Sequence, residues 1–132
     1  MSKVRVFTSL ICLGLTTMTQ ATPLEIQFTN NTSVALNTEI AGLPGRGIES
    51  NVSKSVFVGI VQVACNQANS MNNCPLHFFN KQTGEKVASV NMNVNNFTLT
   101  SPPVLYGEYN QRFNVTGWES NPITHITISE RS

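Results

Sequence analysis

The chain has 132 residues, enough for one ordinary domain, and its 8 basic and 7 acidic residues leave a formal charge of +1. Only 11% of the residues are charged, so the chain lacks the basic patch that binding to nucleic acid or to an anionic membrane surface requires. Every acidic residue is a glutamate, which excludes a Ser-His-Asp triad and an aspartate-rich calcium loop.

The N-terminal segment has the three parts of a secretory signal. Lys3 and Arg5 form a short positive region, residues 6–15 are largely apolar, and the polar stretch that follows ends at Ala21 with small residues where a signal peptidase cleaves. The apolar run is about 10 residues, too short for a membrane span of about 20. We therefore predict a signal peptide of the compact kind typical of bacteria, cleaved after Ala21. The mature domain, residues 22–132, is expected to be secreted or periplasmic and to have no transmembrane segment.

Most of the mature chain alternates between apolar and polar residues, which is typical of half-buried β-strands. The segments with this alternation, or with a short apolar run between turn residues, are 24–29, 34–40, 76–79, 87–94, 97–99, 104–109, 113–115 and 123–128. Residues 81–84 lie between two of these segments and predict a β-hairpin. Residues 41–51 contain three glycines and one proline, and we predict a loop there.

One segment differs, because residues 56–63 are apolar on both faces and rich in valine. Since β-branched residues favour strands, we predict that this segment is the central and most buried strand and that it continues to Cys65. About eight strands separated by turns indicate an all-β fold. An antiparallel β-sandwich is favoured over a small closed β-barrel, because one strand is apolar on both faces and the others on one.

The mature domain retains two cysteines, Cys65 and Cys74, because Cys12 lies within the predicted signal peptide. An even number of cysteines in a small exported domain indicates a disulfide. It would close a loop of about ten residues and stabilise the fold by roughly 2.5–3 kcal/mol. The pair lacks the spacing and the neighbouring histidines of a zinc site, so we predict no metal and no cofactor.

Sequence motifs for catalysis are missing. His77 and His125 are the two histidines, and no nucleophile elbow of the G-x-S-x-G kind supports Ser89 or Ser129 as a nucleophile. A small hydrolase that uses glutamate and one histidine is therefore the least favoured hypothesis, and we predict no catalytic residue.

Four residues are candidate contacts for a protein or glycan partner. Trp118, Tyr109 and Arg112 lie in polar, glycine-containing segments where aromatic rings and an arginine can anchor a partner, and Arg46 lies in the predicted 41–51 loop. The favoured hypothesis is an exported, non-enzymatic binding module that acts on a host or cell-envelope partner.

The alternative hypothesis is a structural subunit of a surface assembly. The low charge gives little repulsion between copies, and the alternating strand at residues 24–29 could pair with the edge of a neighbouring subunit. The two hypotheses differ in oligomeric state, because the binding module predicts a monomer and the subunit predicts open-ended self-association.

Overall fold

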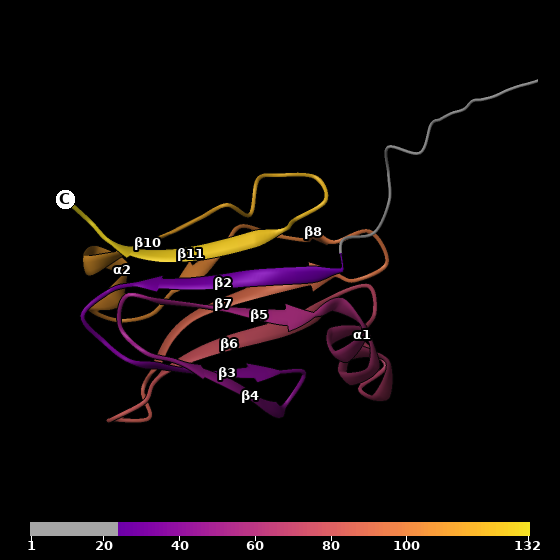
Figure 1. The fold of residues 1–132 in the computed structure, drawn as a ribbon, viewed down its shortest axis with the longest axis horizontal. Helices are drawn as coiled ribbons and strands as arrows, with labels where there is room; N and C mark the ends of the chain where they lie inside the picture. The colour runs from indigo at the N-terminus through magenta and orange to yellow at the C-terminus, as the bar shows by residue number, and fades with distance from the viewer. Residues whose placement is uncertain (1–23) are drawn as a thin grey trace, which may run out of the picture.

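The computed structural model describes residues 24–132, which form two β-sheets packed face to face (Figure 1). The first sheet contains four strands in the order β10 (Phe113–Thr116), β11 (His125–Glu130), β2 (Glu25–Asn31) and β5 (Val52–Phe57). The second contains β4 (Leu43–Ile48), β3 (Leu36–Ile40), β6 (Cys74–Asn80), β7 (Lys86–Asn93) and β8 (Thr98–Leu99) in that order, and β9 (Val104–Leu105) also pairs with β7. The predicted all-β sandwich is confirmed, with ten strands in the described residues. The predicted signal peptide, residues 1–21, lies outside them.

Strand β2 lies inside the four-stranded sheet. Its alternation places Ile26 and Phe28 in the core between the sheets, as the sequence predicts. It pairs with β5 in antiparallel fashion and with β11 in parallel, and this parallel pair is the exception to the antiparallel pattern among the described strands. Both edges of β2 are therefore occupied by strands of the same chain.

The predicted hairpin is also confirmed, because β6 and β7 pair in antiparallel fashion with Leu76 opposite Val90. Gly84 has a φ of +77° in the turn, a conformation that glycine adopts without strain. The following segment agrees less well. Only Val104–Leu105 of the predicted strand 104–109 is extended, and the chain then forms α2, a single turn of helix at Tyr109–Arg112. No described helix is long and apolar enough to cross a membrane.

The prediction of a central strand at residues 56–63 is wrong. Strand β5 ends at Phe57, and the ten residues that follow form helix α1 (Val58–Gln67). The reason lies in the partner strand. Phe57 pairs with Glu25 at the start of β2, and the Val58 N–H donates to the Leu24 carbonyl. Beyond this point the described chain offers β5 no further strand, so the backbone satisfies its polar groups within a helix.

The prediction of a loop at residues 41–51 is also wrong, because residues 43–48 form β4, an edge strand that pairs with β3. Proline and glycine are tolerated here because an edge strand bonds on one side alone. The register shifts between Asn37 and Glu39, and this irregularity accommodates Pro44 opposite Glu39.

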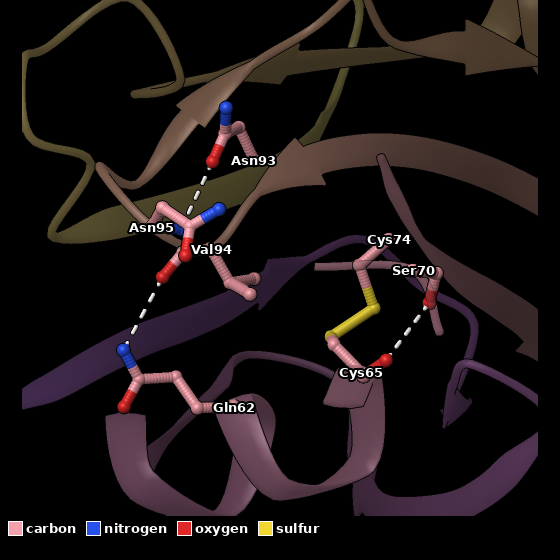
Figure 2. Close-up of a disulfide and its surroundings, with 7 residues drawn as sticks. All are labelled: Gln62, Cys65, Ser70, Cys74, Asn93, Val94 and Asn95. Carbon is pink, nitrogen blue, oxygen red and sulfur yellow. Dashed lines mark hydrogen bonds between the residues drawn. A yellow bond between two sulfur atoms is a disulfide. The ribbon is translucent and has the colours of Figure 1, made fainter. Parts of the chain in front are cut away.

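The predicted disulfide forms between Cys65, near the end of α1, and Cys74, the first residue of β6 (Figure 2). It therefore joins a helix to a strand. Both cysteines are fully buried, and the Ser70 N–H donates to the Cys65 carbonyl within the loop that the disulfide closes. On the adjoining turn of α1, the Gln62 Nε2 donates to the Val94 carbonyl at 3.2 Å. These contacts fix α1 against the end of the larger sheet.

A second fixed point is Asn30, a fully buried amide at the end of β2. Its Nδ2 donates to the carbonyls of Val34 at 2.7 Å and Ile48 at 3.0 Å. Its Oδ1 accepts the backbone N–H and the hydroxyl of Thr32 at 3.0 and 2.6 Å. The Asn51 N–H donates to the Asn30 carbonyl. One side chain thus joins the β2–β3 and β4–β5 connections, both of which cross between the sheets.

Replacing Asn30 with alanine is expected to lower the free energy of unfolding by about 2–4 kcal/mol, because it leaves buried donors and acceptors without partners. Urea unfolding followed by circular dichroism measures the change. The matched control is Asn31→Ala, an exposed neighbour for which we expect a change within about 0.5 kcal/mol. Equal losses in the two variants would contradict this role for Asn30.

Replacing Cys65 and Cys74 together with serine is expected to lower the free energy of unfolding by about 2–3 kcal/mol. This is the stabilisation expected when a disulfide closes a loop of about ten residues and lowers the conformational entropy of the unfolded chain. The same variant should be cleaved by protease within residues 66–73 faster than the oxidised protein. Unchanged cleavage of that loop would show that its hydrogen bonds, and not the disulfide, hold it.

Candidate functional site

The described surface has an apolar groove with a volume of about 800 Å³. Three elements line it: the β3–β4 turn with the first half of β4, the end of β5, and the outer face of α1. In Figure 1 the helix stands at the end of β5, beside the turn of the β3–β4 hairpin. We call this hollow the apolar groove.

Large apolar side chains exposed to solvent gather at the apolar groove. They are Phe57 (62% exposed), Ile60 (58%), Val63 (58%) and Leu43 (46%). Single exposed apolar residues are normal on a protein surface, but a contiguous group that lines a hollow is typical of a binding surface. This grouping is the most distinctive feature of the described surface.

Helix α1 is apolar on two faces, and each has its own place. Val58, Val61 and Cys65 follow the helical spacing and are buried against the sandwich. Ile60 and Val63 are three residues apart, lie next to each other on the helix surface, and face the groove. The inner face accounts for the folding of the helix, whereas the outer face has no partner in the described chain.

Arg46 is the one charged side chain among the residues that line the apolar groove. Its Nη1 donates to the Ser55 carbonyl on β5 over 3.4 Å, a long hydrogen bond. The ion pairs of the described residues join Lys81 to Glu49 and Arg112 to Glu108, so Arg46 has no carboxylate partner there. Arg46 also borders a small cavity of about 10 Å³, which shares Ile40 and Val56 with the groove and is lined by Lys54 as well.

Arg46 is thus the predicted contact residue that the fold places on the groove. The other three lie around α2 and β10, and β10 is at the opposite edge of its sheet from β5. There Arg112 lies over the rings of Tyr109 and Phe113, at 5.7 and 5.1 Å from their centres, and pairs with Glu108 at 3.0 Å.

Tyr109 is 4% exposed, and its hydroxyl donates to Glu85 at 3.0 Å and accepts from the Asn80 amide at 3.1 Å. Trp118 is half-buried against the core, and its Nε1 donates to the Val115 carbonyl at 3.1 Å. These aromatic side chains therefore already have partners within the fold.

Sequence reasoning missed Phe57, Ile60 and Val63 because their segment was interpreted as a buried strand. One signal was available. The apolar residues Val58, Val61 and Cys65 recur at helical spacing and are interrupted by polar Gln62. A helix that packs through Val58, Val61 and Cys65 would have Ile60 and Val63 on its outer side.

A row of polar residues crosses the outer side of the larger sheet. Glu39 lies opposite His77, and His77 lies opposite Ser89. The Nδ1 of His77 and the Oγ of Ser89 are 2.5 Å apart, and the Tyr106 hydroxyl donates to the same Oγ at 3.0 Å. Burial lowers the pKa of His77 below its ordinary value of 6.5, the charge of Lys86 lowers it further, and Glu39 opposes both. The lowered pKa favours the neutral imidazole, whose tautomer decides whether Nδ1 accepts the hydrogen bond from the Ser89 hydroxyl or donates to it.

This row resembles part of a hydrolase site but is closed to solvent at the nucleophile. Ser89 is 5% exposed, and its oxygen already accepts the Tyr106 proton. No hydrogen bond between Glu39 and His77 is among those of the described residues, so the row lacks the carboxylate that would orient the imidazole.

Replacing His77 with asparagine is expected to flatten the pH dependence of stability. Because the pKa of His77 is lower in the folded state, the unfolded chain binds a proton first as the pH falls. The contribution of neutral His77 is full above about pH 6.5 and is lost as the pH falls from there toward the folded-state pKa. Thermal unfolding of the wild type and the variant from about pH 7.5 to 5 measures the slope of stability against pH for each protein. Equal slopes in the variant and the wild type would contradict this assignment.

Comparison with known proteins places the chain in a family. The family model of the type II secretion system substrate NttC matches residues 1–123. The crystal structure of the Legionella pneumophila type II secretion system substrate NttC is 18% identical, and the match covers 83% of this chain and 100% of that one with a TM-score of 0.63. At this identity the likeness shows a common fold. A search of curated proteins finds no match. The chain belongs to the NttC family of type II secretion system substrates and is an exported protein.

Proposed function

We propose that this protein is a non-enzymatic binding module that acts after export, and that the apolar groove is the surface that holds its partner. One observation carries the proposal: four large apolar side chains stay in water around a hollow of about 800 Å³. Burying such a side chain stabilises a complex by about 1.5–3 kcal/mol, so the groove offers binding free energy that the folded chain does not use. A host or cell-envelope partner would meet the groove once the protein is outside the cytoplasm.

The chemistry of the groove favours an apolar ligand group over a sugar. The groove has one aromatic ring, Phe57, but its neighbours Leu43, Ile60 and Val63 are aliphatic and offer none of the hydrogen bonds that sugar hydroxyls need. Trp118, Tyr109 and Arg112 remain predictions for a second contact surface, at which a protein partner would have to displace their internal contacts.

The structural-subunit hypothesis has less support. It relies on a strand at residues 24–29 that can pair with a neighbour. In the described chain β2 is paired along both edges, with β5 and with β11, so strand exchange would require it to leave its own sheet. The hydrolase hypothesis has little support as well, since Ser89 is buried beneath the hydrogen bond from Tyr106.

Replacing Ile60 and Val63 together with glutamine is expected to weaken binding of Nile red, an uncharged apolar dye, by at least about tenfold. Glutamine is a good helix former and both sites are exposed, so the free energy of unfolding should change by less than about 1 kcal/mol. Dye fluorescence at increasing protein concentration measures the affinity.

The matched control is Val104→Gln, which replaces an exposed valine on β9 that does not line the groove. We expect this variant to bind the dye like the wild type. Equal binding by all three proteins, or no binding by the wild type, would contradict the proposed function of the groove.

A further inference from the structure

We infer that the ligand of the apolar groove is a single-chain amphiphile with a carboxylate head, such as a long-chain fatty acid anion. In this assignment the carboxylate pairs with Arg46 and the hydrocarbon chain lies along the outer face of α1. The inference rests on the proposed function and adds the chemical class of the ligand.

The size and lining of the groove are those of a small-molecule site. Such sites have volumes of about 300–1,000 Å³ and combine a mainly apolar wall with a few polar groups that fix the orientation of the ligand. The apolar groove has about 800 Å³, and its polar side chains are Arg46, Ser55 and Gln67. An extended hydrocarbon chain needs the apolar wall and requires no further hydrogen bonds.

The charge of the groove selects the head group. Arg46 is exposed, and its side chain makes one long hydrogen bond, to the Ser55 carbonyl. A guanidinium has five N–H donors in a planar fork that matches a carboxylate, so most of its donors are available to a ligand. Lys54 borders the same small cavity as Arg46 and adds a second positive charge nearby.

The acidic side chain of β3 makes no ion pair with Arg46. Glu39 lies opposite Pro44 on β4 and opposite His77 on β6. Neighbouring residues of a strand alternate between faces, so Glu39 lies on the opposite face of β3 from Thr38 and Ile40. Thr38 lines the small cavity, and Ile40 lines both the cavity and the groove. Arg46 therefore lies beside an apolar wall and makes no ion pair among the described residues, and the acidic residue next to the groove is Glu25, opposite Phe57.

Two other occupants fit less well. An extended peptide that adds a strand needs a free sheet edge, but Arg46 occupies the Ser55 carbonyl and Pro44 has no N–H to donate. A second copy docked about a two-fold axis through the groove would bring one Arg46 close to the other, and the two positive charges would repel each other. An anionic ligand would instead be attracted to Arg46.

The test compares three probes with the same chain of 12 carbons: laurate and dodecyltrimethylammonium below their micelle concentrations, and dodecanol below its solubility limit. Displacement of Nile red gives each affinity. We expect laurate to bind about tenfold more tightly than dodecanol, and the cation most weakly, because a hydrogen bond to a charged group contributes more than one between neutral groups. Affinity should rise about fourfold for each methylene added to the carboxylate series, up to the length of the groove.

Arg46→Gln should reduce laurate binding to the level of dodecanol and leave dodecanol unchanged, whereas Arg131→Gln, at an exposed arginine outside the groove, should change neither. The Ile60 and Val63 double variant should lose all the probes.

If laurate and dodecanol bind equally and Arg46→Gln has no effect, the carboxylate assignment fails and the groove remains an apolar site. If the wild type binds neither probe nor Nile red, the proposed function fails as well. Growth of molar mass with protein concentration, measured by light scattering and abolished in the double variant, would instead assign the groove to a second copy.

Discussion

The arrangement of the groove depends on one buried amide. The Asn30 Nδ2 donates to the Ile48 carbonyl at the end of β4, and the main-chain carbonyl of Asn30 accepts the Asn51 N–H just before β5 begins, so this residue holds the two edge strands together at one end. The groove is lined by the other ends of the same strands, residues 43–46 and 55–57, where they separate. Because a buried amide must have all its hydrogen bonds satisfied, the spacing at the Asn30 end is tightly specified. The groove lies at the far ends of β4 and β5, away from that fixed point.

Helix α1 forms the remaining wall under a different constraint. The register between β2 and β5 ends at Glu25 and Phe57, so the chain must leave the sheet there. The disulfide and the bond from Gln62 to Val94 then hold the helix against the sandwich. Its inner face is fully used in that packing, which leaves the outer face of Ile60 and Val63 as the part of the helix that folding does not explain.

The sequence predicted the features that depend on local patterns and left out those that depend on contacts between distant segments. Alternation correctly predicted β2 and the β6–β7 hairpin, and the even cysteine count predicted the disulfide. Helix α1 was missed because valine favours strands, whereas the lack of a partner strand beyond Phe57 in the described residues depends on tertiary pairing. Strand β4 was missed because its proline and glycines are typical of a loop. They are compatible with a strand only at the edge of a sheet, and the sequence does not show that β4 lies there. Arg46 was named as a contact, but its apolar neighbours come from three separate segments.

The two surfaces that carry candidate contact residues differ in how fully their side chains are bonded within the fold. Around α2, the aromatic rings, the guanidinium and the hydroxyl already satisfy one another, as the contacts of Tyr109 with Glu85 and of Arg112 with Glu108 illustrate. A partner that binds there would break these internal interactions, so its binding free energy would be only the difference between the new contacts and the lost ones. In the apolar groove the side chains are in water and Arg46 has no carboxylate partner among the described residues. Binding there displaces one long hydrogen bond of Arg46, so the cost of association is not increased by the loss of many internal contacts.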